Sequence, residues 1–143
     1  MSKISLEQAS VIVDKTLEKG RELGLAPLTV AVLDDGGHLT ALKREDGSGI
    51  LRVEIASAKA WGALGMGFPS RVLSKRAEGM PLFFDALTTV SGGRLVALPG
   101  GVLIRDASGA LLGSVGVSGD VADNDEICAV HGVEAAGLSA DIG

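Results

Sequence analysis

The stretch 34–39, DDGGHL, places His38 directly after two acids and two glycines, between the apolar runs LTVAVL and LTAL. A histidine titrates near neutral pH, so His38 can act as a general acid or base, or donate a hydrogen bond to a ligand carboxylate. The same residue can instead belong only to the turn and cap it. The chemical interpretation requires the turn to present the imidazole to a cavity and not to bulk water.

Two cations further along the chain are candidate anchors for an acidic ligand. Arg44 and Lys59 can each pair with a carboxylate, and arginine can do so through two parallel hydrogen bonds. For any single charge, a solvated cation or a surface ion pair is the simpler explanation. Both interpretations stay open for both residues.

The segment 113–126, GSVGVSGDVADNDE, is a second candidate for ligand binding. Gly116 and Gly119 allow a ligand to approach the backbone closely, and Ser118 with the start of the next helix offers N–H donors to an anion. Four acids crowd the same segment: Asp120, Asp123, Asp125 and Glu126. These acids repel an anion and can complement the helix dipole themselves, so a purely structural role is the alternative.

The second histidine, His131, lies in a segment that is apolar almost all round a predicted helix, which indicates partial burial. Glu134 can accept its ring N–H and fix its orientation. We therefore include His131 among the candidate ligand-binding residues, with a histidine satisfied at a subunit contact as the alternative. A zinc site needs a third ligand, and no spacing supports Asp34, Asp46 or Asp125 in that role, so no metal site is predicted.

The composition indicates one globular, cytoplasmic domain over residues 1–143. Hydrophobic residues make up 46% of the chain and charged residues 22%. No apolar run approaches the ~20 residues of a membrane helix, and the N-terminus lacks the pattern of a signal peptide. A single cysteine, Cys128, excludes an internal disulfide. The net charge of −5, scattered basic residues and 3% aromatics argue against a nucleic-acid surface.

Apolar periodicity and turn residues predict a helix, a hairpin, several helices, strands and a final helix. SLEQ at 5–8 is a capping box for the first helix. The hairpin joins 28–33 to 39–42, and a type I′ turn at 35–36 would place Leu33 opposite His38. Ser48 is expected to cap the second helix and Ser70 to cap a short basic helix that ends near residue 79, and Pro81 is expected to begin another short helix.

The second half of the chain reads as strands followed by a helix. We expect strands at 94–98, 101–106 and 110–119, and a helix from about 124 to 138, with Asp123 and Glu126 as its cap pair. Strands joined by tight turns indicate an antiparallel sheet covered by helices, an α+β fold. The 21 glycines, with alanines inside the same elements, predict close packing between elements or between subunits.

Five blocks give the chain a family resemblance: VAVLDDGGHLTALKREDG, AKAWGALG, GGRLVALPGGVLI, GALLGSVGVSGD and DNDEICAVHGVEAAGL. Together they resemble the GlcG/HbpS-type haem-binding domain family, whose domain also forms the C-terminal part of PduO-type proteins. The resemblance implies a profilin-like α/β/α sandwich, a homo-oligomer and a link to haem, to corrinoid-related functions or to catabolic operons. It makes His38 a candidate axial haem ligand. One departure is Leu103, where relatives often have proline.

Three functional hypotheses follow from these residues and the resemblance. The preferred one is an oligomeric small-ligand-binding protein that holds haem or a related tetrapyrrole, with His38 in contact. The second is an enzyme acting on a small carboxylated metabolite, with His38 as acid or base and Arg44 or Lys59 as anchor. The third is an accessory assembly protein without a ligand.

Overall fold

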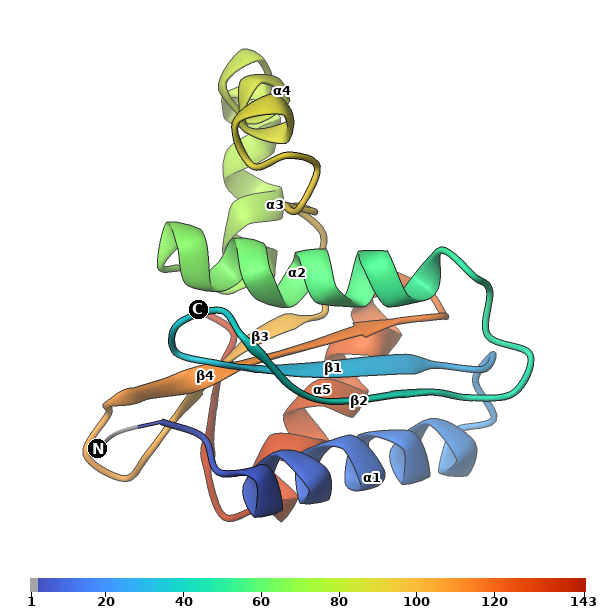
Figure 1. The fold of residues 1–143 in the computed structure, drawn as a ribbon. Helices are drawn as coiled ribbons and strands as arrows, with labels where there is room; N and C mark the ends of the chain where they lie inside the picture. Colours follow the sequence, from blue (N-terminus) through green and yellow to red (C-terminus); the bar gives the residue numbers. More distant parts are fainter. Residues whose placement is uncertain (1–2) are drawn as a thin grey trace.

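The computed structural model describes residues 3–143 as five helices and one five-stranded sheet (Figure 1). The first half contains α1 (Leu6–Glu22), β1 (Thr29–Asp34), β2 (Leu39–Arg44), α2 (Arg52–Met66), α3 (Ser70–Gly79) and α4 (Pro81–Val90). The second half contains β3 (Gly101–Arg105), β4 (Leu111–Ser118), α5 (Ala122–Ala135) and β5 (Ser139–Asp141). No helix in this described part of the chain combines the length and apolarity needed to cross a membrane.

The sheet is antiparallel throughout, in the order β2-β1-β4-β3-β5. Helix α2 covers one face, and α1 and α5 cover the other (Figure 1). Buried aliphatic side chains fill the α1–α5 side, among them Ile12, Val30, Val32, Val115 and Val133. The predicted α+β fold, a profilin-like α/β/α sandwich, is confirmed.

Small residues allow α2 to lie close against the sheet. A side chain at Gly116 in β4 would collide with the backbone carbonyl of Ala56 in α2. The hydroxyl of Ser114, also in β4, donates to the carbonyl of Ala60 at 2.8 Å. The predicted close packing of small residues is therefore present within the chain, between α2 and the sheet.

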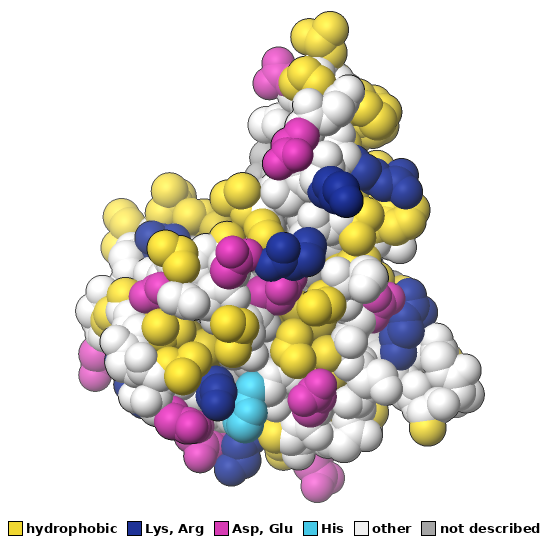
Figure 2. All heavy atoms as spheres, turned by 180° about the vertical axis from the view of Figure 1, so that it is seen from behind, with side chains coloured by type: hydrophobic (Ala, Val, Ile, Leu, Met, Phe, Trp, Pro, Cys, Tyr) yellow, Lys and Arg dark blue, Asp and Glu magenta, His cyan; other side chains and the backbone are white. Residues whose placement is uncertain are grey.

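Helices α3 and α4 form a projection that stands away from the sandwich (Figure 1). Helix α3 contacts α2 and β3 at its base, whereas α4 packs on α3. Large apolar side chains of α4 face solvent, with Leu82 85% exposed and Val90 80% exposed. Hydrophobic side chains accordingly gather along the projection and at its tip (Figure 2).

The first capping box is confirmed, and the other three predicted caps are wrong. Ser5 Oγ accepts the Gln8 N–H at 3.1 Å, and Gln8 accepts the Ser5 N–H at 3.1 Å. Ser48 does not cap α2, because its hydroxyl is buried in a 2.8 Å hydrogen bond with the Thr29 hydroxyl. Ser70 does not cap α3, because it is the first residue of that helix and its hydroxyl accepts the Gly101 N–H at 2.6 Å. Helix α5 begins without a side-chain cap, because Val121 holds the N-cap position and Asp123 already lies in the first turn, where it pairs with Arg71 at 2.6 Å.

The predicted strand at 94–98 is also wrong, since this segment has no strand structure. Its Leu95 packs against Gly62, so the segment crosses α2 and does not join the sheet. The final helix ends at Ala135, earlier than expected, and 139–141 form the edge strand β5 beside β3. An apolar run can cover a helix or extend a sheet, and its periodicity alone does not distinguish the two.

Candidate functional site

The carboxylate of Asp34 organises the turn between β1 and β2. Its Oδ1 accepts the backbone N–H groups of Gly36 at 2.9 Å and His38 at 3.0 Å. The turn spans 35–38, and only Gly37 in it has a left-handed φ, of 82°. The expected type I′ turn is therefore wrong, and Leu33 pairs with Leu39 instead of His38 after a register shift.

The imidazole of His38 lies on the surface with one nitrogen engaged. Its Nδ1 is 3.2 Å from Asp34 Oδ1, and its side chain is 80% exposed. The His38 backbone N–H, with the Gly36 N–H and the imidazole, holds the pKa of Asp34 below 3.8, despite opposing desolvation. An ionised carboxylate only accepts hydrogen bonds, so Nδ1 is the donor in this contact, and Nε2 has no partner within residues 3–143.

A cavity of about 430 Å³ lies immediately beside this turn. Gly37 and Leu39, the chain neighbours of His38, line it, but His38 itself does not. With 80% of its side chain exposed, the imidazole faces solvent, so the turn does not present it to the cavity as the chemical interpretation required. Its apolar wall consists of Leu33, Leu39, Ala58 and Trp61, and Glu54, Ser57 and Arg94 supply its polar groups. A largely apolar hollow with few polar groups is the usual composition of a small-ligand site.

The loop after α4 brings Arg94 to the cavity. Gly92 and Gly93 have left-handed φ values of 67° and 79°, and both line the cavity. The Arg94 guanidinium carbon lies 4.1 Å from the centre of the Trp61 ring, and its Nε donates to the Ser91 carbonyl at 2.8 Å. Sequence reasoning missed both residues. The only tryptophan in the chain and the SGGR turn were the available signals.

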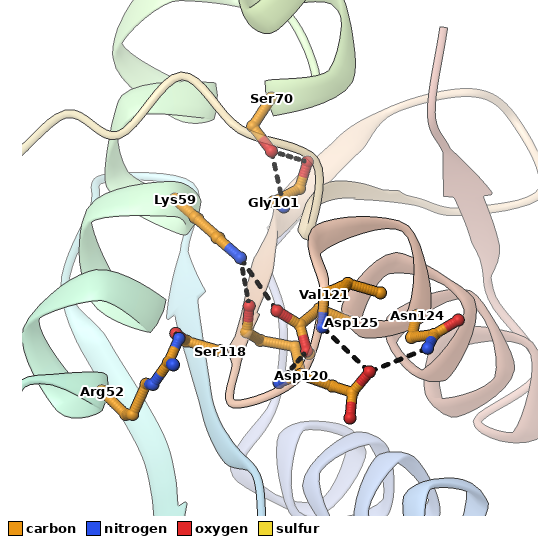
Figure 3. A network of polar contacts seen from close by, with 10 residues as sticks. Arg52, Lys59, Ser70, Gly101, Ser118, Asp120, Val121, Asn124 and Asp125 are labelled. Carbon is orange, nitrogen blue, oxygen red and sulfur yellow. Dashed lines mark hydrogen bonds and ion pairs between the residues drawn. The ribbon is translucent and has the colours of Figure 1, made fainter. Parts of the chain in front are cut away.

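Lys59 lies on the other side of α2, in a buried polar network (Figure 3). Its Nζ donates to the Val117 carbonyl at 2.9 Å and to Asp125 Oδ2 at 3.1 Å, with 3% of the side chain exposed. Burial lowers the pKa of Lys59 and raises the pKa of Asp125, while the attraction between the two charges opposes both shifts. Lys59 is thus occupied in joining α2, β4 and α5.

The same network contains the expected glycine-rich ligand segment. Ser118 is buried and its hydroxyl accepts a hydrogen bond from Arg52 at 3.0 Å (Figure 3). Gly116 lies under α2, and a side chain at Gly119 would collide with the Pro27 carbonyl. The glycines therefore allow contact between parts of this chain, and neither they nor Ser118 line the cavity.

Arg44 and His131 also lie apart from the cavity. Arg44 donates to the Ser48 carbonyl at 2.8 Å and lines a separate groove near the end of α1. His131 is half-buried on α5, on the sheet face opposite α2, and Glu134 makes no hydrogen bond to it within residues 3–143. In that same part of the chain no three His, Cys, Asp or Glu side chains cluster to hold a metal ion.

Fold and cavity define an α/β/α sandwich with a ligand-sized hollow at one end of its first hairpin. The chain belongs to the HbpS-like family, because the family model described as haem-degrading protein HbpS-like matches residues 4–134. The resemblance inferred from the sequence blocks is confirmed. No curated protein matches the chain.

Solved structures share the fold over nearly the whole chain. The PduOC:heme complex has a TM-score of 0.86 at 24% identity, over 97% of this chain and 99% of PduOC. HbpS has a TM-score of 0.80 at 29% identity, over 94% and 90% of the two chains. The Klebsiella pneumoniae protein ORFY has a TM-score of 0.85 at 22% identity, over 96% and 92%.

Proposed function

We propose that this chain binds haem or a related tetrapyrrole in the cavity between the 35–38 turn, α2 and the 92–94 loop. The observation that carries the proposal is the cavity itself, about 430 Å³ with an apolar wall. This volume lies within the roughly 300–1,000 Å³ of typical small-molecule sites. Membership of a family described as haem-degrading, and the haem held by PduOC, support the choice of ligand.

The cavity offers a planar ligand an apolar surface and one ring. Leu33 and Leu39 come from the two strands of the hairpin, and Trp61 comes from α2. Such side chains can cover one part of a macrocycle, while its remainder extends past the open rim. His38 lies between two lining residues, Gly37 and Leu39, and only its Nδ1 is engaged, so it is the proposed axial ligand of a macrocycle that extends past the cavity.

Filling the cavity tests this proposal. Ser57→Phe adds a ring at the cavity wall, and Ser74→Phe makes the same change on α3, outside the cavity. We expect haemin titration, followed by its visible absorption band, to show at least about tenfold weaker binding for Ser57→Phe. Ser74→Phe should bind as the unmodified chain does. Equal affinities for both variants and the unmodified chain would exclude this cavity as the haem site.

His38→Ala tests the axial role separately. Loss of an axial nitrogen changes the ligand field of the iron, so the position of the band should shift and the affinity should fall. A spectrum identical to that of the unmodified chain would assign the iron ligand to another group. That result would leave the cavity proposal intact, because haemin titration of Ser57→Phe tests the cavity independently of His38.

The second candidate, an enzyme acting on a small carboxylated metabolite, is favoured by the pairing of His38 and Asp34. A carboxylate that orients an imidazole leaves the other ring nitrogen able to take or give a proton. Turnover of a small organic acid with a bell-shaped pH profile, lost in His38→Ala, would support this function. A panel of such acids without turnover would leave it without support.

A homo-oligomer is proposed on the apolar surface of the projection. Met80 is 48% exposed and Phe83 45% exposed, next to the more exposed Leu82 and Val90. Contiguous exposed apolar side chains mark protein contact sites, and a second copy is the proposed partner. Leu82→Asp should lower the mass measured by light scattering, whereas Thr88→Asp, a charge at an exposed position on the side of α4 away from Leu82, should not.

The third hypothesis, an assembly protein without a ligand, is an outcome of the same measurements. A bound ligand raises the stability of the folded chain by mass action. If haemin and a panel of organic acids leave the melting temperature unchanged while Leu82→Asp reduces the mass, the assembly role is the remaining function.

A further inference from the structure

Arg94 is the cation of the cavity, and most of its donors are unoccupied. Its guanidinium carbon lies over the Trp61 ring, 4.1 Å from the ring centre, and Nε donates to the Ser91 carbonyl at 2.8 Å. Within residues 3–143 its two terminal nitrogens have no hydrogen-bond or ion-pair partner. The group is therefore held in place by stacking and one backbone contact, with its outer edge open to a ligand.

The local backbone makes this placement specific. Ser91 closes α4, and Gly92 and Gly93 then turn the chain through the left-handed region. Only glycine adopts this region without strain, so the two residues direct Arg94 back over α2. Packing of Leu95 against Gly62 secures the other side of the loop.

We propose that Arg94, stacked on Trp61, binds a carboxylate of the cavity ligand through its terminal nitrogens; this inference rests on the proposed function of the cavity. A guanidinium edge matches a carboxylate with two parallel hydrogen bonds. A haem propionate and a small organic acid both carry this group. The anchor role that the sequence suggested for Arg44 and Lys59 falls to Arg94.

Glu54 adds a negative charge to the cavity, so an acidic ligand has a preferred orientation in it. It lines the same hollow, and no ion pair joins it to Arg94 within the described residues. A carboxylate near Glu54 is repelled, whereas one at Arg94 is attracted, so an acidic ligand enters with its acid group toward the 92–94 loop. Its apolar part then lies on Leu33, Leu39 and Trp61.

A matched pair of arginines makes the inference testable. Arg76 stacks on Phe68 with the same 4.1 Å separation as Arg94 on Trp61, but it lies on α3 and outside the cavity. Haemin and haemin dimethyl ester, which has no ionised carboxylate, are titrated into the unmodified chain, Arg94→Gln and Arg76→Gln. We expect a preference of about tenfold for haemin that Arg94→Gln abolishes and Arg76→Gln retains. Glu54→Gln should strengthen the preference.

Benzoate distinguishes failure of the anchor from failure of haem binding. Trp61 is the only tryptophan and the chain has no tyrosine, so its fluorescence reports on the cavity alone. Haemin bound with equal affinity to its ester, or with a preference unaffected by Arg94→Gln, overturns the anchor and leaves haem binding intact. If haemin does not bind but benzoate changes the Trp61 fluorescence only when Arg94 is present, the anchor stands and haem is excluded. No response to either probe overturns both.

Discussion

A cation lies on each side of α2, and the two cations differ in whether their N–H donors already have partners. Lys59, on the side of β4 and α5, is 3% exposed and donates to Val117 and Asp125. Arg94, on the side of the hairpin, is exposed and donates only through Nε within residues 3–143. A buried cation with partners holds elements together, whereas a stacked cation with open donors is available to a ligand. The same helix therefore borders a buried network, in which the cation has its partners, and a cavity, in which the cation has open donors.

The largest effect expected from this comparison is on the stability of the buried network. Lys59→Met leaves the Asp125 carboxylate in the interior without its partner. Removal of one member of a buried pair costs about 3–5 kcal/mol. The free energy of unfolding, measured with urea, should fall by that amount.

A double variant separates the contribution of the Lys59–Asp125 charge pair to stability from the contribution of the packed lysine stem. Asp125→Asn removes the charge but still accepts the backbone N–H of Asp120, which Asp125 Oδ1 binds at 3.0 Å. Lys59→Met/Asp125→Asn should therefore be more stable than Lys59→Met alone. If the double variant is as unstable as the sum of the two single ones, the two charges are not coupled and the network is misdescribed.

Arg94→Gln should have a much smaller effect on folding. An exposed cation–π contact contributes about 0.5–1 kcal/mol, and the Ser91 contact lies at the surface of a loop. We expect urea unfolding to show a loss within that range. A loss as large as that of Lys59→Met would make Arg94 a structural residue and remove the contrast between the two sides.

The fold was largely predictable because its signals are local. A capping box, alternating apolar runs and short turns depend on neighbouring residues, and the order of the elements then indicates an antiparallel sheet under helices. The segment 94–98 shows the limit of this reasoning. Leu95 packs on Gly62, more than thirty positions earlier in the chain, and no local pattern encodes that contact.

The candidate site was less predictable, because burial and partners in the folded molecule decide whether a side chain is free to bind a ligand. His38 was found through its place beside glycines, and the structure puts its neighbours Gly37 and Leu39, but not His38 itself, in the cavity lining. Lys59 and Arg94 look alike as charges in a sequence. Only burial and partners assign Lys59 to the interior and Arg94 to the cavity.

The smallest effect expected is at the turn that carries His38. The pKa of Asp34 lies below 3.8 in the folded chain, so its contribution to stability is fully present above the unfolded value and is lost as pH falls through the folded one. The stability difference between the unmodified chain and Asp34→Asn should therefore shrink below about pH 4. Unfolding by urea at a series of pH values measures it.

Asp35→Asn is the control for this pH dependence. Asp35 is the next residue, and its carboxylate makes no hydrogen bond within the described part of the chain. Its substitution should give a smaller and flatter difference over the same pH range. A difference for Asp34→Asn that does not change with pH would show that the carboxylate does not organise the turn.

The most direct test of the cavity as the ligand site is a nuclear magnetic resonance titration with diamagnetic gallium protoporphyrin. The single tryptophan gives one indole N–H signal, and glycine amides report on both sides of α2. We predict that the signals of Trp61, Gly37 and Gly93 shift in proportion to bound ligand, while those of Gly116 and Gly119 stay in place. Shifts at Gly116 and Gly119 without a change at Trp61 would contradict the account.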